Sequence, residues 1–332
     1  MAFAIIAAPG ASGSSLFSII ELFSIANQIS SNTRTRQTTP LFNTTLCTLE
    51  GEAIFSSGIS IAPEKSVTEI ASADLLYIAP PGISSEKELT LHTAQWNNMV
   101  AWLQTEHTRF RTIASHCSGT FILAQAGLLT GGRATTAWWL CDMLVRNHPE
   151  LEVDTDAIVL QSGKCCTAAG TSAYQDLGLE LLRQLAGSDT SRLAAKYLMT
   201  DRQRRSQSSY RLDLPDRSNG SDLVPQARQW IKENLAHDFK IDDLASALEI
   251  RPRTLLRRFQ QHTGGTPLAL VQSMRMERSK ILFETTDLPT DTIARRCGYR
   301  DESAFRRVFK RHCGLSPKEY RLRFRAKPDH SE

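Results

Sequence analysis

The sequence predicts two domains of different fold class: an α/β domain with a parallel sheet in residues 1–200 and an all-α domain in residues 223–327. Three observations support this division. Residues 1–200 alternate short apolar runs with segments of helical periodicity, which is typical of a parallel sheet covered by helices on both faces. Residues 201–222 are polar and have no period, which predicts a linker. Residues 223–327 contain one helical pattern twice.

The apolar runs of the N-terminal domain predict its elements in order. Residues 3–8, 75–79 and 111–115 predict buried strands, and residues 16–29, 93–106 and 118–126 predict helices. No Lys or Arg precedes the first apolar run, and Pro, Gly and Ser interrupt the segment after it. We therefore expect a buried strand there rather than a secretion signal. No apolar run reaches the length of a membrane span.

The C-terminal domain repeats one pattern after 49 residues in its first part and 50 in its second. Each copy has a short apolar helix, a tight turn and a second helix that carries an arginine pair. A helix-turn-helix requires this layout, because the first helix supports the second while the second presents its outer face to the major groove of DNA. Residues 268–284 predict a rigid helix between the two units. The matching positions are Leu244 with Ile293, Ala245 with Ala294, Leu255 with Phe305, Phe259 with Phe309, Gly264 with Gly314, and Pro267 with Pro317.

Helical period assigns a buried and an outward face to the second helix of each unit. Leu255 and Phe259 are four residues apart, as are Phe305 and Phe309, so these side chains are expected to point into the core. Most outward residues are Arg or Lys, which bind guanine edges and phosphates. A solvated basic face is the alternative for a single arginine pair, but two copies in register favour DNA binding. The outward residues are Arg253, Leu256, Arg257 and Gln260 in the first unit and Ser303, Arg306, Arg307 and Lys310 in the second.

Charge is distributed unevenly along the chain. Residues 221–327 contain 22 Lys and Arg against 13 Asp and Glu, whereas residues 1–200 contain 12 against 17. A basic domain after a mildly acidic one indicates that only the C-terminal domain meets nucleic acid.

The cysteines indicate the compartment. There are seven, with no CxxC pair and no metal-site spacing, and their odd number argues against a disulfide framework. We therefore expect a reducing cytoplasm, no metal and no cofactor. The cysteines are Cys47, Cys117, Cys141, Cys165, Cys166, Cys297 and Cys313.

Residues 225–325 resemble the C-terminal DNA-binding domain of the AraC/XylS transcription regulators, which has seven helices and two helix-turn-helix units. The matching stretches are LASALEIRPRTLLRRFQQHTGGTP, LVQSMRMERSKILFETTDLP and IARRCGYRDESAFRRVFKRHCGLSPKEYRLRF. Two positions depart from the family pattern: Glu249 stands where the family usually has Gly, and Arg251 where it usually has a Ser N-cap. The resemblance implies base contacts by Arg253, Leu256 and Arg257, and by Glu302, Ser303, Arg306 and Arg307.

The stretch IASHCSGT places Cys117 where a predicted strand meets a predicted helix. A small residue at a strand end, followed by Gly and a helix, is typical of a nucleophile elbow, a sharp turn that exposes one side chain above the sheet. The helix N-terminus is expected to lower the pKa of the Cys117 thiol and to offer backbone N–H groups to an anion.

Together with AGLLTGGRATTAWW and CTAAGTSAYQDLGLELL, this stretch resembles the DJ-1/PfpI domain, a flavodoxin-like parallel α/β fold related to class I glutamine amidotransferases. Such a domain followed by an AraC-type domain is similar to the GlxA family of regulators. The family's usual His and helix-start acid are replaced here by Ala137 and Ser15. His116 is expected to be a core or lid histidine, because a residue just before an elbow points away from its neighbour. Without a base, Cys117 is predicted to line a pocket, and no catalytic residue is assigned.

Three interpretations of the chain differ in class. In the first, the N-terminal domain binds a small metabolite and forms homodimers, while the C-terminal domain binds double-stranded promoter DNA and acts with RNA polymerase as an activator. In the second, the chain is a cysteine-dependent hydrolase or amidotransferase-like enzyme with a DNA-binding appendage. In the third, Cys117 is a buried small residue without a pocket. We expect the first, because the DNA-binding pattern is complete and the catalytic pattern is not.

The predicted ligand site is formed around the elbow. Free N–H groups at Ser118, at Gly119 and near Gly82 favour a carboxylate or another anion. Trp138 or Trp139, if it faces the pocket, is suited to a cationic amine through cation–π contact, with core packing as the alternative for each. The sequence thus suggests an amino acid or betaine-like zwitterion, which the resemblance allows, because relatives regulate amino-acid and quaternary-amine catabolism. The predicted ligand-binding residues are Gly82, His116, Cys117, Ser118, Gly119 and Trp138.

Overall fold

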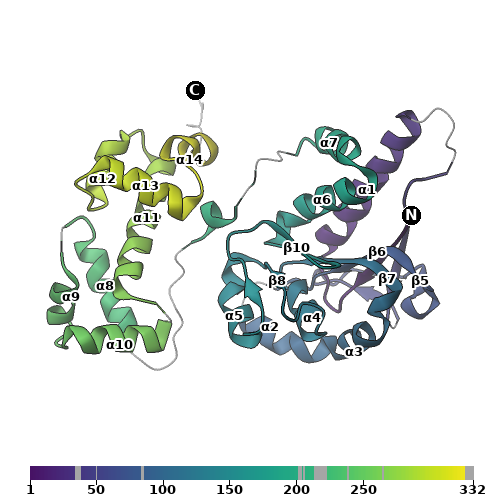
Figure 1. The fold of residues 1–332 in the computed structure, drawn as a ribbon, viewed down its shortest axis with the longest axis horizontal. Coiled ribbons are helices and arrows are strands. Elements are labelled where there is room, and N and C mark those ends of the chain that lie inside the picture. Colours follow the sequence, from purple (N-terminus) through teal and green to yellow (C-terminus); the bar gives the residue numbers. More distant parts are fainter. Residues whose placement is uncertain are drawn as a thin grey trace. The chain divides into compact units, whose positions relative to one another are not determined.

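Two compact units make up the chain, Met1–Gln207 and Ser208–Glu332 (Figure 1). The computed structural model describes residues 1–33, 39–49, 51–83, 86–200, 204, 206–212, 223–237, 239–263 and 265–325. Gly264 lies outside the described residues, as does most of the predicted linker 201–222.

A seven-stranded sheet forms the centre of the N-terminal unit, with the strand order β10-β11-β7-β6-β1-β2-β5. All neighbouring strands are parallel except the edge strand β10, which runs antiparallel to β11. The predicted parallel α/β fold is confirmed, whereas the antiparallel edge was not predicted. It follows from the short β10–β11 connection around Gly163, since only antiparallel strands can be joined by so few residues. The strands are β1 (Ala2–Ala7), β2 (Asn43–Thr48), β5 (Lys65–Ser66), β6 (Ala73–Ala79), β7 (Phe110–His116), β10 (Val159–Ser162) and β11 (Cys165–Ala168).

Short strand pairs and helices surround this sheet. Helices α1, α6 and α7 pack against one another on one face, and α2 to α5 lie on the other (Figure 1). Two further strand pairs are β3 (Ala53–Ile54) with β4 (Ser60–Ile61), and β8 (Arg133–Ala134) with β9 (Glu152–Val153). The helices are α1 (Gly13–Thr33), α2 (Glu86–His92), α3 (Asn97–Glu106), α4 (Gly119–Gln125), α5 (Cys141–Asn147), α6 (Tyr174–Ala186) and α7 (Ser188–Tyr197).

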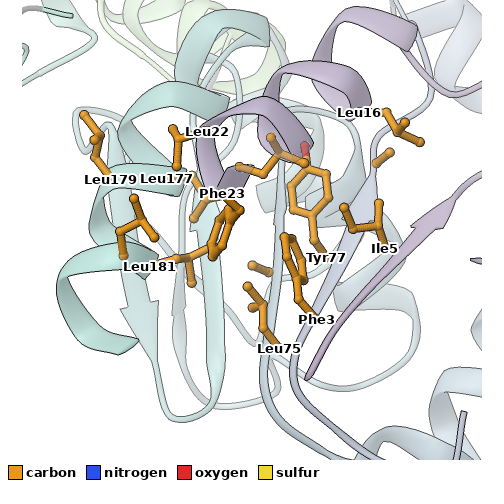
Figure 2. Packing of buried hydrophobic residues seen from close by; sticks show 14 of the residues in the cluster. Phe3, Ile5, Leu16, Leu22, Phe23, Leu75, Tyr77, Leu177, Leu179 and Leu181 are labelled. Carbon is orange, nitrogen blue, oxygen red and sulfur yellow. The ribbon is translucent and has the colours of Figure 1, made fainter. Parts of the chain in front are cut away.

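Each face of the sheet has its own hydrophobic core. Successive residues of β1 alternate between the two cores, with Phe3 in one and Ala4 in the other, because side chains of a strand have a period of two. Figure 2 shows the core under α1, where the ring of Phe23 lies 4.5 Å from that of Phe3. Helix α6 approaches α1 closely at Gly178, where an added Cβ would lie 2.8 Å from side-chain atoms of Ile19. This contact positions α6, whose first turn adjoins the Cys117 elbow.

Seven helices make up the described part of the C-terminal unit, as the AraC-type resemblance predicts. Helices α9 and α10 form the first helix-turn-helix, α12 and α13 form the second, and α11 connects them. Leu255 and Phe259 are buried in a core of the first unit, and Phe305 and Phe309 in a core of the second, so the predicted inward faces are confirmed. The helices are α8 (Leu223–Asn234), α9 (Ile241–Ala247), α10 (Pro252–Thr263), α11 (Pro267–Thr285), α12 (Thr290–Arg296), α13 (Glu302–Cys313) and α14 (Pro317–Phe324).

The tight turns of the two units share one backbone geometry. Glu249 has a φ of 55° and the equivalent Gly298 has a φ of 77°, both in the left-handed region that favours glycine. The amide of Ile250 donates to the Ala245 carbonyl at 3.0 Å, and at the second turn Tyr299 donates to Ala294 at 2.9 Å. The glutamate that departs from the family pattern therefore keeps the turn, at a conformational cost of about 1–2 kcal/mol.

All seven cysteines are buried free thiols. None of the described helices combines the length and apolar character that a membrane span requires. Within the described ranges, no three His, Cys, Asp or Glu side chains cluster as metal ligands would.

Candidate nucleic-acid interface and elbow site

The outward residues predicted on α10 and α13 lie at the surface. All eight are exposed, and Glu302 at the start of α13 is half-buried. Leu256 keeps 46% of its surface exposed, which suits contact with a thymine methyl group. The two helices therefore present faces that combine basic, amide and apolar groups, as base readout requires. The exposed residues are Arg253, Leu256, Arg257, Gln260, Ser303, Arg306, Arg307 and Lys310.

The two recognition faces differ in one ion pair. Both Nε and Nη2 of Arg306 donate to Glu302 Oε1, at 2.9 and 2.6 Å. The equivalent of Glu302 in the first unit is Pro252, which cannot form such a pair. An exposed pair of this kind adds little stability, but it orients the guanidinium of Arg306 along the helix. Asp301 caps α13 by accepting a hydrogen bond from the amide of Ser303 at 2.8 Å.

Cys117 occupies a strained turn between β7 and α4. Its φ is 51°, an uncommon value for a residue other than glycine, and its amide donates to the Ala169 carbonyl at 2.8 Å. Gly119 is required two residues later, because an added Cβ would lie 1.9 Å from Ser115 Oγ. The strand, the strained residue and the close-packed glycine together form the elbow geometry that the sequence predicted.

The predicted lowering of the Cys117 pKa is wrong. Burial raises the pKa of the thiol to about 11, although hydrogen bonds from Ser118 and Thr171 act in the opposite direction. Cys117 is only 4% exposed, so the cost of burying a thiolate outweighs the hydrogen bonds that favour it. The thiol is therefore protonated at neutral pH.

His116 points away from the thiol into a buried polar network. Its Nδ1 lies 3.1 Å from the hydroxyl of Tyr77, and its Nε2 lies 3.2 Å from Ser15 Oγ. Burial lowers the pKa of His116 to about 3, so the imidazole is neutral. Both ring nitrogens are engaged by hydroxyl groups, and His116 is not placed to take a proton from Cys117.

Two of the remaining predicted ligand residues, Gly82 and Ser118, are already paired within the protein. The amide of Gly82 donates to the Gly10 carbonyl at 2.9 Å, so this donor is not free for an anion. The hydroxyl of Ser118 donates to the Pro81 carbonyl at 2.7 Å. Trp138 is half-buried and meets Trp139 edge to face, with ring centroids 5.3 Å apart.

Two elbow residues were missed by the sequence analysis. Thr136 Oγ1 donates to the Cys117 carbonyl at 2.7 Å, and the Thr171 side chain lies near enough to the thiol to lower its pKa against the effect of burial. Both threonines lie in the stretches that carry the DJ-1/PfpI resemblance, but nothing in their local pattern distinguishes them. We call the segments that carry these two threonines the walls of the elbow. One wall is the segment of Thr136, just before Trp138, and the other is the short turn that begins at Thr171 and precedes α6.

Comparison with known proteins agrees with this geometry. Residues 20–184 match the DJ-1/PfpI family, and residues 244–323 match the family described as helix-turn-helix domain. A Vibrio parahaemolyticus protein of known structure shares the α/β fold with a TM-score of 0.51 and 21% identity, over 60% of this chain and 98% of its own.

Two regulators cover different parts of the chain. The HTH-type transcriptional regulator CdhR of Pseudomonas aeruginosa is 25% identical over 82% of this chain and 79% of its own length. The arabinose operon regulatory protein of Escherichia coli is 35% identical over 30% of this chain and 34% of its own length. The chain therefore joins a DJ-1/PfpI domain to an AraC-type helix-turn-helix domain, the architecture of an HTH-type transcriptional regulator.

Proposed function

We propose that this regulator binds promoter DNA through α10 and α13 as a homodimer, and that its N-terminal domain responds to a small zwitterion at the elbow. The observation that carries the proposal is the repeat itself. Two recognition helices bury equivalent aromatic or aliphatic residues and expose equivalent arginines, Arg257 and Arg307. A basic face that occurs twice at the same position of the same motif is suited to two segments of major groove.

An amino acid or a betaine-like molecule fits the chemistry of the elbow. The start of α4 favours a carboxylate, and the half-buried indole of Trp138, two residues from the wall residue Thr136, favours a cationic amine. Cys117, Ser118 and Thr136 are buried in this structure, whereas Thr171 is exposed, so a ligand that reaches the thiol has to displace the exposed wall at Thr171.

The N-terminal domain is proposed to sense rather than to catalyse. A nucleophilic cysteine needs a base and a thiolate, whereas the contacts of the Cys117 thiol are the hydroxyl-bearing residues Ser118 and Thr171 and its pKa is about 11. At pH 8 such a thiol is ionised to about one part in a thousand. Turnover of an amide substrate that disappears in Cys117→Ser would instead support the hydrolase or amidotransferase alternative.

The remaining parts of the proposal follow from DNA binding. A regulator of this architecture acts in the cytoplasm, where its DNA lies. We propose that it activates transcription by contacting RNA polymerase beside the bound promoter. Dimerisation doubles the number of groove segments that one complex reads, which raises specificity.

The test of DNA binding is in vitro selection of duplexes with the full chain, followed by hydroxyl-radical footprinting. Because the 19-residue helix α11 separates the two units, we expect each chain to protect two patches on one DNA face, about 34 Å apart. A duplex of scrambled sequence serves as the control. A single short patch per chain would show that only one unit enters the groove and would contradict the proposed mode of binding.

The test of the ligand class is a thermal-shift screen with amino acids, betaines and polyamines. A ligand present at 100 times its Kd stabilises the folded protein by about 2.7 kcal/mol, so the melting temperature of the N-terminal domain rises. Trp138→Ala should weaken this response by about 1–2 kcal/mol of binding energy, and Trp138→Phe should keep most of it. An equal response in the wild type and in Trp138→Ala would place the ligand elsewhere.

A further inference from the structure

The two walls of the elbow are both bonded to residues that lead to the C-terminal unit. We call the described residues 204 and 206–211 the strap. The guanidinium of Arg204 donates to Ser172 Oγ at 2.8 Å and to the Ser172 carbonyl at 3.0 Å, and it forms an ion pair with Asp176. Ser172 follows Thr171, whose side chain acts on the pKa of the Cys117 thiol. The first end of the strap therefore holds the wall that precedes α6.

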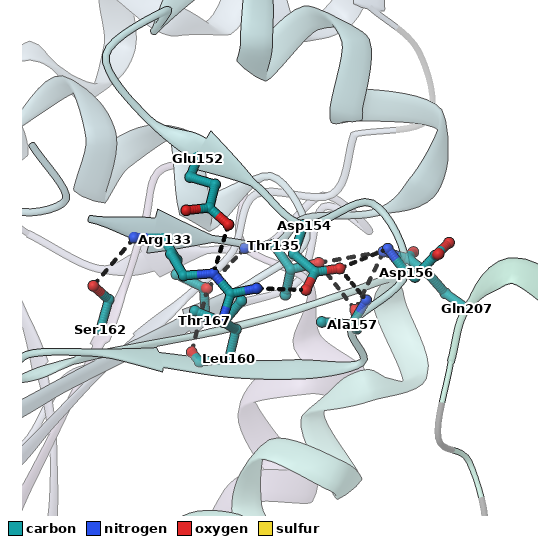
Figure 3. Close-up of polar contacts among 10 residues, drawn as sticks. All are labelled: Arg133, Thr135, Glu152, Asp154, Asp156, Ala157, Leu160, Ser162, Thr167 and Gln207. Carbon is teal, nitrogen blue, oxygen red and sulfur yellow. Dashed lines mark hydrogen bonds and ion pairs between the residues drawn. The ribbon is translucent and has the colours of Figure 1, made fainter. Parts of the chain in front are cut away.

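Gln207 holds the other wall. Its amide group Nε2 donates to the Thr136 carbonyl at 3.0 Å, and its backbone amide donates to the Asp156 carbonyl at 2.8 Å. Figure 3 shows this side chain among Thr135, Asp156 and Ala157. Gln207 is only 2% exposed, so it is part of the N-terminal unit rather than a surface linker residue. Thr136 in turn donates its hydroxyl to the Cys117 carbonyl, which leaves one residue between the strap and the elbow.

The second end of the strap is hydrogen-bonded inside the C-terminal unit. The Arg211 carbonyl accepts a hydrogen bond from Lys280 Nζ at 2.6 Å, and Lys280 is only 2% exposed. Arg323 donates to the Tyr210 hydroxyl at 2.9 Å. If the strap moved away, the buried ammonium of Lys280 would lose an acceptor, which is unfavourable. The C-terminal end is therefore expected to stay attached when the other end is displaced.

The short turn formed by Ser208–Tyr210 packs directly against α13, the second recognition helix. Only Ser208 and Ser209 separate Gln207 from Tyr210, and both serines are buried. Few residues are therefore available to take up a displacement of Gln207 before it reaches the residues that support α13.

We propose that the strap transmits the state of the Cys117 elbow to the second recognition helix. A ligand that opens either wall moves Ser172 or Thr136, and the Arg204 or Gln207 bonded to it moves with it and pulls on Tyr210 and Arg211, which shifts the support of α13. This inference rests on the proposed regulatory function, and it names Gln207 as a positioning residue for DNA recognition rather than a DNA contact.

The test lengthens the connection while keeping every bond at both ends. A flexible Gly-Ser insert of about six residues is placed between Gln207 and Ser208, and the matched control carries the same insert between Gly220 and Ser221. The elbow is perturbed without ligand by Thr136→Val, which removes the bond to the Cys117 carbonyl, and separately by Thr171→Val on the other wall. The Kd for a duplex selected with the wild-type chain is measured by fluorescence anisotropy, and folding is checked by calorimetry.

We expect each Thr→Val change to weaken DNA binding at least about fivefold, the lower end of allosteric coupling, in the uninterrupted chain and in the control insert. With the insert after Gln207 the effect should fall below about twofold, within the range of independent sites. If the effect of Thr→Val stays as large with that insert, the proposed role of the strap is wrong. It is also wrong if both Thr→Val variants fold and neither weakens DNA binding in the uninterrupted chain. Failure of the wild type to select any duplex would instead overturn the proposed function.

Discussion

The double substitution Arg257→Ala and Arg307→Ala is expected to weaken binding to the selected duplex by about 2–6 kcal/mol. Each arginine is exposed at the same position of its recognition helix, and the loss of one bidentate contact to guanine costs about 1–3 kcal/mol. The two sites are on separate helix-turn-helix units with separate cores, so their effects should add. Anisotropy titrations of the selected duplex and of a scrambled duplex measure the loss.

The matched control is Arg183→Ala with Arg192→Ala. These arginines lie on α6 and α7, are exposed, and form surface ion pairs within their helices. The control therefore removes the same charge from the N-terminal unit and should leave DNA affinity within about 0.5 kcal/mol of the wild type. Equal weakening on the selected and the scrambled duplex would contradict base readout and identify Arg257 and Arg307 as phosphate contacts.

Gly298→Ala should destabilise the C-terminal unit by about 2–5 kcal/mol. The φ of Gly298 is 77°, and an added Cβ would lie 2.6 Å from the Leu235 carbonyl oxygen and 2.7 Å from Arg275 Nη2. The left-handed backbone costs about 1–2 kcal/mol for alanine, and the forced shift of packed atoms adds about 1–3 kcal/mol. Scanning calorimetry should show the C-terminal transition at a temperature lower by about 10 °C or more.

The first helix-turn-helix supplies the control for this prediction. Glu249 is the equivalent turn residue and already carries a Cβ at a φ of 55°. Glu249→Ala should therefore change the stability by less than about 0.5 kcal/mol. A comparable loss in both variants would mean that the second turn is no tighter than the first, against the contacts of Gly298.

The sequence was sufficient to predict the features that depend on local backbone geometry, such as the faces of a helix. The spacing of Phe305 and Phe309 assigned the inner face of α13 and thereby the outer face with Arg306 and Arg307, because the period of a helix does not depend on what it packs against. Continuous apolar runs predicted parallel strands because a strand covered by helices on both faces needs apolar side chains in both directions. The turn at Glu249 shows the limit of such rules, because a residue that departs from the family pattern still adopts the left-handed conformation.

The elbow also has a part that the sequence predicted and a part that it did not. Its strand, turn and helix are contiguous in the sequence, so IASHCSGT was enough to predict the geometry of Cys117. The pKa of the thiol was predicted in the wrong direction, because burial is determined by segments that come from elsewhere in the chain. The hydrogen bonds from Ser118 and Thr171 that favour the thiolate are weaker here than burial.

The sequence by itself determined the two fold classes, the inner and outer faces of both recognition helices, and the position of the elbow, since each of these depends on residues only a few positions apart. Only the tertiary structure decided which groups surround the elbow and where the strap is held. Ser15 meets His116 across 101 residues, Gln207 meets Thr136 across 71, and Lys280 meets Arg211 across 69. Such contacts leave no periodic trace in a single sequence, because the partners are brought together by the packing of whole elements rather than by the local path of the chain.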